Sequence, residues 1–331
     1  MKKIIITGGL GYIGMELAKI YSGLNRTHEV IVLDRDFHSA RVSQLKRWGI
    51  KFHQIDILDE EMISNAILDA NIIYHLAGIT DVGTTKNDIN NARDKEVRKV
   101  GVKGTKNIIK YSNSDCKIIF PSTHVIFEGL KKVRKDLDEK ERPKPLFEYS
   151  KGKSTSEVDI INSGINYVIL RLGSVYGNSY DSTRLNIMTN LFSKITSENG
   201  KLYLFGSGKQ LKSIVSVLDV ARCLHFTGEN NQINKEIFNC VNENLTVKEI
   251  GKICKKINKN IDLNLTDDEI PNLGYSLSNK KIKNHGFKFL YGVEESIKVM
   301  FDSWKDREIL NENEFIEVGK NSFIDEKSED F

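Results

Sequence analysis

The chain begins MKKIIITGGLGYIGMEL, residues 1–17, so that glycines follow directly on a run of isoleucines. The run at residues 4–6 is short, apolar and β-branched, which predicts a strand buried on both faces. Residues 12–20 then repeat apolar side chains at helical spacing. A buried strand therefore passes into a helix through a turn that contains Gly8, Gly11 and Gly14.

The glycines stand where a phosphate can bind, because the first turn of a helix presents unpaired backbone N–H groups and the positive end of the helix dipole. Gly8 permits the tight turn, Gly11 lets the backbone approach a pyrophosphate, and Gly14 allows the helix to pack closely. We expect Tyr12 and Ile13, at the start of the helix, to contact the same ligand. A glycine-rich turn without any ligand is the alternative.

Acidic residues at the next two strand ends favour a dinucleotide over a bare turn. Asp34 follows the apolar stretch EVIVL, 20 residues after the last glycine, where a carboxylate can bond the ribose 2′-hydroxyl. It would repel a 2′-phosphate, so NAD is expected rather than NADP, although Arg35 could bind such a phosphate. A third strand begins at Phe52 and ends in Asp56, which can meet an adenine amine or cap a helix. Its neighbour Ile57 is expected to line the same site.

Strands and helices go on alternating, with further strands expected at residues 71–78, 117–122 and 166–173. Regular alternation with buried strands predicts an α/β fold, a doubly wound parallel Rossmann sheet with helices on both faces. Ligands of such sheets bind at the carboxyl ends of the strands. Further cofactor-binding residues are therefore expected at Leu76, Ala77, Gly78 and Ser122.

The pattern divides the chain into a large and a small unit. Residues 1–173 are expected to form the nucleotide-binding domain, with segments near 213–241 returning to it. Residues 174–305 are expected to form a smaller, mainly substrate-binding α/β domain. The tail at 306–331 ends in acidic residues, and we expect it to be frayed or disordered.

Several local expectations follow from the same pattern. Residues 91–112 are expected to form one helix, and residues 131–145, which are rich in charge, a solvated loop. Residues 217–226 are expected to start as a strand and continue as a helix. A further helix is expected at 246–257, with a capping box because a Glu stands three residues after the Thr at its start.

Composition excludes several classes of function. The 331 residues carry a net charge of +4, which does not indicate a basic nucleic-acid binder. No apolar run of about 18 residues is present, so no membrane span is expected, and the opening strand is unlike a signal peptide. Scattered cysteines predict neither a metal site nor disulfides, and they fit a cytoplasmic location. These cysteines are Cys116, Cys223, Cys240 and Cys254.

The stretch YSKGK, residues 149–153, offers acid–base chemistry. On a helix, Tyr149 and Lys153 lie one turn apart on the same face. A phenol titrates near ~10, so Tyr149 can act as a base near neutrality only if its pKa falls well below that value. The Lys153 ammonium and a cationic nicotinamide could lower it, and the Tyr149 and Lys153 side chains are both expected to contact the cofactor, Lys153 through the nicotinamide ribose. The pair is common by chance, and its place behind a dinucleotide fingerprint makes it a catalytic candidate.

Together these residues resemble the extended short-chain dehydrogenase/reductase family of nucleotide-sugar epimerases and dehydratases. The segments TGGLGYIG, HLAG, YSKGK and RLGSVYG occur in the family's order. The resemblance implies NAD as the cofactor and a nucleoside-diphosphate sugar as the substrate. It also implies that Tyr149 takes a sugar hydroxyl proton while hydride passes to the nicotinamide, and that a Ser or Thr at the end of the fifth strand bonds the same oxygen.

The family pattern places that hydroxyl four residues before an aromatic side chain. It selects Thr123 rather than Ser122, because Phe127 follows at this spacing. His124 is a candidate acid or base, with a place in the pocket wall as the alternative. The resemblance implies further contacts to the substrate from Thr80, His124, Ser174 and Lys212.

Departures from the family pattern narrow the reaction. Family 4,6-dehydratases carry an Asp–Glu pair after the threonine, where this chain has His124 and Val125; this argues against dehydration and against the decarboxylases that use the Glu. Gly101 stands where many members have an Asn that supports the active-site helix, and Ser174 where they have an Asn before VYG. Lys212 takes the place of a phosphate-binding Arg of the family. A lysine keeps the positive charge but lacks the bidentate guanidinium; an ordinary surface lysine is the alternative.

The resemblance thus favours an NAD-dependent epimerase that acts at C4 of the sugar through a transient ketone. The stretch HLAGITDVG, residues 75–83, supports this because it is similar to the matching part of 4-epimerases. The alternatives are a 4-keto-sugar reductase that consumes added NAD(P)H, and a non-catalytic member that binds NAD. By analogy with the family, helices at 91–112 and 149–163 pair across a homodimer.

Overall fold

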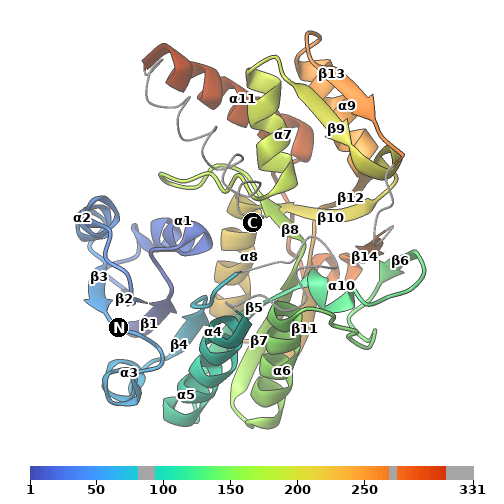
Figure 1. The fold of residues 1–331 in the computed structure, drawn as a ribbon. Coiled ribbons are helices and arrows are strands. Elements are labelled where there is room, and N and C mark those ends of the chain that lie inside the picture. The colour runs from blue at the N-terminus through green and yellow to red at the C-terminus, as the bar shows by residue number, and fades with distance from the viewer. Residues whose placement is uncertain (81–93, 268–273, 311–331) are drawn as a thin grey trace, which may run out of the picture.

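The computed structural model describes residues 1–80, 94–267 and 274–310. Its centre is a seven-stranded sheet with strand order β11-β7-β5-β4-β1-β2-β3, in which all neighbours are parallel (Figure 1). The strands are β1 (Lys2–Thr7), β2 (His28–Asp34), β3 (Lys51–Gln54), β4 (Ile72–His75), β5 (Lys117–Thr123), β7 (Asn166–Leu172) and β11 (Glu236–Cys240). The doubly wound Rossmann fold predicted from the sequence is confirmed.

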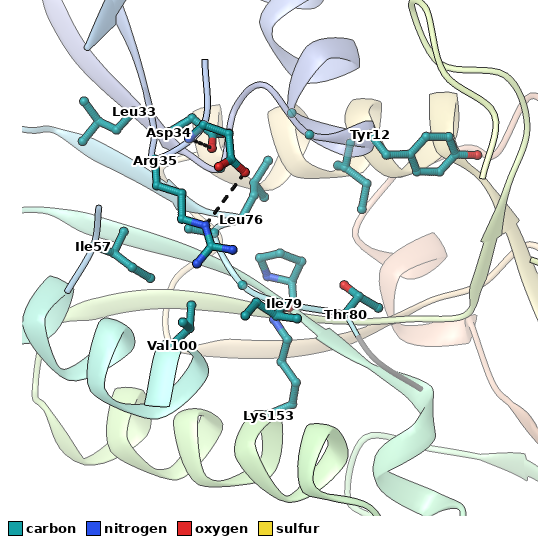
Figure 2. Close-up of a pocket in the computed structure, with 18 of the residues that line it drawn as sticks. Tyr12, Leu33, Asp34, Arg35, Ile57, Leu76, Ile79, Thr80, Val100 and Lys153 are labelled. Carbon is teal, nitrogen blue, oxygen red and sulfur yellow. Dashed lines mark hydrogen bonds and ion pairs between the residues drawn. The ribbon is translucent and has the colours of Figure 1, made fainter. Parts of the chain in front are cut away.

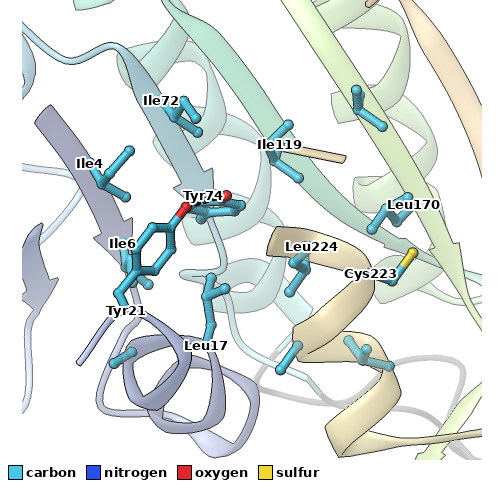
Figure 3. Packing of buried hydrophobic residues seen from close by; sticks show 14 of the residues in the cluster. Ile4, Ile6, Leu17, Tyr21, Ile72, Tyr74, Ile119, Leu170, Cys223 and Leu224 are labelled. Carbon is cyan, nitrogen blue, oxygen red and sulfur yellow. Dashed lines mark hydrogen bonds between the residues drawn. The ribbon is translucent and has the colours of Figure 1, made fainter. Parts of the chain in front are cut away.

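Both faces of the sheet are covered, because side chains alternate along each strand. Ile4 and Ile6 join one apolar cluster and Ile5 joins the other. Figure 3 shows the first cluster, in which the hydroxyls of Tyr21 and Tyr74 lie 2.7 Å apart. Its helices are α1 (Tyr12–Tyr21), α2 (Ser39–Arg47), α8 (Val217–Glu229) and α10 (Lys280–Asn284); α3 (Glu60–Ile67), α5 (Gly104–Tyr111) and α6 (Glu148–Asn162) cover the opposite face.

A second group of elements lies beyond the carboxyl edge of the sheet (Figure 1). Three small sheets have the orders β12-β10-β8, β13-β9 and β14-β6. Their strands are β6 (Arg134–Leu137), β8 (Ser174–Tyr176), β9 (Lys201–Leu204), β10 (Leu211–Ser216), β12 (Glu243–Thr246), β13 (Asp262–Leu265) and β14 (Tyr275–Leu277). The helices α7 (Met188–Ser197), α9 (Val247–Ile257) and α11 (Val293–Leu310) pack around a separate apolar core.

Several local expectations are corrected by the structure. Residues 217–226 are helical throughout, because Ser216 accepts a hydrogen bond from the Leu218 N–H and starts α8 there; the strand is β10, just before it. The stretch 131–145 contains β6, which pairs with β14. Short β-branched or charged stretches carry little periodicity, so the sequence does not show where β10 ends or that β6 forms.

Two helices also differ from expectation. The helix expected at 91–112 consists of α4 (Asp94–Arg98), a π-helical turn (Lys99–Lys103) and α5, and its first three residues lie outside the described part. α11 continues to Leu310, so the first residues of the expected tail are helical. The capping box between Thr246 and Glu249 at the start of α9 is confirmed.

No helix in the described ranges is both long enough and apolar enough to span a membrane. Within the same ranges, no group of three or more His, Cys, Asp or Glu side chains could hold a metal ion.

Candidate active site

A cavity of about 310 Å³ lies at the carboxyl edge of the sheet, beside the start of α1 (Figure 2). The fifteen residues predicted to bind the cofactor all line it, together with Thr80. These fifteen are Gly8, Gly11, Tyr12, Ile13, Gly14, Asp34, Arg35, Asp56, Ile57, Leu76, Ala77, Gly78, Ser122, Tyr149 and Lys153. The structure therefore brings together residues that the sequence spreads over about 150 positions.

The glycine turn is shaped by close backbone contacts. Gly8 has φ +65°, and a Cβ there would lie 2.7 Å from the backbone of Ala77. A Cβ on Gly14 would lie 2.5 Å from the Cα of Gly9, so this glycine packs the helix against the turn itself. Gly11 begins α1 without a side-chain cap, which leaves that helix end to a ligand.

Asp34 is held in place by the glycine turn. Its carboxylate accepts hydrogen bonds from Leu10 N at 3.0 Å and Asp36 N at 3.2 Å. Burial raises the pKa of Asp34, and these two backbone bonds oppose that rise. A carboxylate fixed in the cavity wall is suited to accept bonds from ribose hydroxyls.

Arg35 is engaged by carboxylates on both sides. Its guanidinium lies 3.4 Å from the carboxylate of Glu96 and 3.8 Å from that of Asp36. These two carboxylates engage the Arg35 cation and Asp34 adds a third negative charge to the cavity wall, so the local field disfavours a 2′-phosphate.

Asp56 lies beyond the end of β3 rather than in it. Its carboxylate accepts a hydrogen bond from Leu58 N at 2.9 Å, within a local turn. The possibility that Asp56 caps the following helix is wrong, because Asp59 caps α3 by accepting from Met62 N. Asp56 and Ile57 both remain in the cavity wall.

Ser122 supplies an observation that fits a bound cofactor. The residue is 2% exposed and lines the cavity. Its Oγ lacks a hydrogen-bond partner within the described residues. A buried hydroxyl without a partner is costly, and a polar ligand in the cavity can satisfy it. The glycine cradle, the Asp34 carboxylate and this hydroxyl together suit a dinucleotide.

Tyr149 is the second residue of α6 and reaches two hydroxyls. The hydroxyls of Thr80 and Thr123 face its phenol. Burial raises the pKa of Tyr149, while Thr80, the positive charge of Arg184 and Thr123 lower it. The net shift is upward, so in this structure the phenol is protonated near neutrality.

Lys153 lies one turn after Tyr149 on α6, as expected. Its Nζ donates to Pro121 O at 2.8 Å and lies 4.4 Å from the centre of the Phe120 ring. Burial lowers the pKa of Lys153 to about 8. The groups that lower the Tyr149 pKa most are Thr80, Arg184 and Thr123; the expected effect of Lys153 together with a bound nicotinamide stays a prediction.

Arg184 is a cavity residue that the sequence did not indicate. It follows β8 in an irregular segment, lines the cavity and acts electrostatically on Tyr149. Asn190, which is fully buried, holds this segment by donating to Arg184 O at 3.0 Å and accepting from Gly177 N at 2.9 Å. An arginine in an irregular stretch has no periodicity to reveal it.

The predicted substrate residues other than Thr80 do not line this cavity. Ser174 and Lys212 lie on the neighbouring strands β8 and β10, and burial lowers the pKa of Lys212. His124 Nδ1 lies 3.2 Å from the Tyr275 hydroxyl, which donates to His124 O at 2.8 Å. Burial, helped by Lys212, lowers the pKa of His124 to about 3. His124 is therefore neutral at physiological pH and bonded to β14, and Tyr275 is a second residue that the sequence missed.

The sequence profile of the NAD dependent epimerase/dehydratase family matches residues 4–240, well over half of the chain. The chain belongs to this family. A curated relative, the UDP-N-acetyl-alpha-D-glucosaminuronate decarboxylase of Bacillus cytotoxicus, is 24% identical over 296 residues, 87% of each chain. The CDP-paratose 2-epimerase of Salmonella typhi is also 24% identical, over 80% of this chain and 87% of that one.

Solved structures of epimerases share the fold. The UDP-glucuronic acid 4-epimerase of Bacillus cereus, crystallised with UDP-glucuronic acid and NAD, has a TM-score of 0.77 at 21% identity and covers 92% of this chain and 99% of its own. The UDP-glucose 4-epimerase of Thermotoga maritima, crystallised with UDP-glucose, has a TM-score of 0.75 at 23% identity, over 93% and 100%. NAD is thus the family's cofactor, while family members differ in the reaction they catalyse.

Proposed function

We propose that this family member is an NAD-dependent epimerase of a nucleoside-diphosphate sugar that acts at C4 through a transient ketone. The observation that carries the proposal is the meeting of Thr123 and Tyr149 beside the dinucleotide cavity without an acid–base pair next to Thr123. Val125 is apolar, and His124 is neutral and bonded to Tyr275. Elimination of water needs a group that can give or take a proton at this place.

The cofactor would be held by the groups that the cavity presents. The start of α1 and the glycine turn suit the pyrophosphate, and Asp34 suits the adenosine ribose. Ser122 Oγ and Lys153 Nζ lie in the cavity wall near Tyr149. Bound NAD supplies a reversible acceptor for the electron pair and hydrogen of a carbinol carbon.

The chain's own residues move the proton. The Tyr149 tyrosinate, whose formation a cationic nicotinamide would favour, accepts the proton of the sugar hydroxyl and later returns it to the carbonyl oxygen. Thr123 donates a hydrogen bond to the same oxygen and orients it. Arg184 favours the tyrosinate, because its charge lowers the Tyr149 pKa. Epimerisation also requires the ketone to turn over in the site before reduction.

A panel of UDP-, dTDP- and CDP-sugars, analysed by chromatography after incubation with the purified protein, tests the reaction. The proposal predicts interconversion of two C4 epimers with no net consumption of added NAD or NADH. Release of carbon dioxide from a uronic acid sugar, loss of water, or stoichiometric oxidation of added NAD(P)H would contradict it. Those outcomes indicate a decarboxylase, a dehydratase or a reductase.

The proposal includes a cytoplasmic homodimer formed through α4, α5 and α6. Two apolar side chains on α6 support it, since Val158 is 52% exposed and Ile161 is 40% exposed. An apolar helix face of this kind is covered readily by a second copy of the same helix. Light scattering tests the assembly: a dimer at micromolar concentration is expected, and Val158→Glu with Ile161→Glu should give a monomer. A wild-type monomer at that concentration would contradict it.

A further inference from the structure

We propose that Glu128 is a positioning residue for this reaction: its carboxylate fixes the first turn of α6, and with it Tyr149, against the turn that follows Thr123. The inference rests on the proposed function in taking Tyr149 as the group that moves the proton. Neither the family pattern quoted above nor the cavity lining includes Glu128.

The contacts of Glu128 describe a helix cap supplied from another segment. Its Oε1 accepts hydrogen bonds from Phe147 N at 3.1 Å, Leu146 N at 3.4 Å and Ser150 Oγ at 2.6 Å. Phe147, the capping position directly before α6, makes no side-chain cap of its own. A carboxylate at a helix start satisfies unpaired N–H groups and interacts favourably with the helix dipole. Ser150 and Phe147 flank Tyr149 in the sequence, so the cap encloses its turn.

The segment that carries Glu128 also carries Thr123. A 3₁₀ turn, His124–Phe127, joins the two residues, and Thr123 Oγ1 accepts from Val125 N at its start. Backbone bonds tie this turn to the approach of α6: Gly129 N donates to Lys144 O at 2.9 Å, and Lys144 N donates to Ile126 O at 2.7 Å. One rigid connection therefore sets the distance between the Thr123 and Tyr149 hydroxyls.

The negative charge of Glu128 also acts on Tyr149, the residue that its hydrogen bonds help to position. The carboxylate raises the pKa of Tyr149 and that of Tyr275, whereas Arg184 lowers that of Tyr149. Burial raises the pKa of Glu128 itself, and the bonds from Ser150, Phe147 and Leu146 oppose that rise. Loss of the charge with retention of the hydrogen bonds should therefore make Tyr149 a stronger acid without moving it.

Two variants separate the two effects, and a third serves as a matched control. Glu128→Gln keeps an acceptor oxygen and removes the charge, whereas Glu128→Ala removes both. Glu148→Gln removes the same charge from the first turn of α6, where the carboxylate pairs with Lys151 at 2.8 Å and Arg98 at 3.5 Å instead of capping the helix.

Hydrogen exchange of the amides at 146–150, with turnover of the converted member of the sugar panel, provides the readouts. In Glu128→Ala we expect at least tenfold faster exchange there. We also expect kcat to fall by roughly 10- to 100-fold, the scale of a misplacement below 1 Å, with KM within about twofold. Glu128→Gln should keep the protection and most of kcat, and should move the acid limb of the pH–kcat profile to lower pH. Glu148→Gln should change none of these.

Unchanged amide exchange and kcat in Glu128→Ala would overturn the positioning role, and an unshifted acid limb in Glu128→Gln would overturn the effect of the charge. If Glu128→Ala fails to fold, retained kcat with a shifted limb in Glu128→Gln still supports the proposal. Failure of the proposed function is recognised separately, because then no panel member is converted by the wild type or Tyr149→Phe is as active as the wild type. The amide exchange needs no substrate and decides the capping role in either case.

Discussion

The glycine turn of the cofactor cavity and the segments that carry Arg184, His124 and Tyr275 are built by different means. Around Gly8 and Gly14 the shape is set by backbone, since a single Cβ at either position would collide with neighbouring main chain. Arg184, His124 and Tyr275 instead come from separate segments that side chains hold: Asn190 donates to Arg184 O, and His124 Nδ1 lies 3.2 Å from the Tyr275 hydroxyl. The cavity shaped by backbone suits NAD, the cofactor that the family shares. Side chains such as Arg184, His124 and Tyr275 can differ from one family member to another.

Tyr149→Phe should have the largest effect on turnover and should leave NAD binding intact. It deletes one hydroxyl, so turnover should fall by about 10² to 10⁴, the usual contribution of a general base, while NAD affinity stays within about twofold. Steady-state rates and calorimetry measure the two quantities. Tyr111→Phe removes a hydroxyl bonded to Glu60, away from the cavity, and is the matched control. Comparable turnover in both variants would remove Tyr149 from the mechanism.

Gly8→Ala should weaken the binding of NAD and should leave α6, which carries Tyr149, in place. The new Cβ meets the Ala77 backbone, and φ +65° strains any L-residue. We expect NAD affinity to fall by roughly 10- to 100-fold, corresponding to about 1–3 kcal/mol of strain and displacement. Gly23→Ala is the control, because a Cβ there meets nothing within 4 Å. Normal NAD binding in Gly8→Ala would show that the turn is not shaped for a phosphate.

Asp34→Asn should reduce the preference of the protein for NAD over NADP. The wild type should bind NAD more tightly than NADP, because the Asp34 carboxylate repels a 2′-phosphate and Arg35 is already engaged by Asp36 and Glu96. Removal of one charge should narrow that preference by roughly tenfold, about 1.4 kcal/mol. Competition calorimetry with both cofactors gives the ratio. A wild type that prefers NADP would assign Arg35 to the 2′-phosphate.

The smallest effect should be a pH dependence of NAD binding. Burial lowers the pKa of Lys153 to about 8, so its ammonium is present below that value and is lost as the pH rises through it. If the ammonium bonds the nicotinamide ribose, NAD affinity should fall a few-fold over this range. Lys153→Met should bind weakly at every pH in the range. An affinity that does not change across this range in the wild type would place Lys153 away from the cofactor.

The same contrast explains what could be predicted from the sequence. The turn at Gly8, the carboxylate at Asp34 and the pair Tyr149–Lys153 are local patterns tied to strand ends or to one helix face, and the structure places them together. The fold followed from the alternation of buried strands and amphipathic helices. The upward pKa shift of Tyr149 could not be foreseen, because burial is a property of the assembled site.

Arg184, Tyr275 and Glu128 could not be predicted from local sequence patterns. Arg184 follows β8 in an irregular stretch, and Tyr275 belongs to a three-residue strand that pairs with the strand overlooked at 134–137. Glu128 reads as an ordinary charged residue before a glycine. Only the meeting of its carboxylate with the start of α6, 18 to 22 residues later, gives it a role.

The most direct test of the central claim follows one hydrogen atom. A UDP-hexose that the protein converts is prepared with deuterium at C4 and incubated with the purified protein and unlabelled NADH, and the product is analysed by mass spectrometry and NMR. The account predicts the C4 epimer with all the deuterium retained at C4, because the hydrogen leaves and returns within one closed site. Loss of the label to added cofactor or to solvent, or a product that is not the C4 epimer, would contradict it.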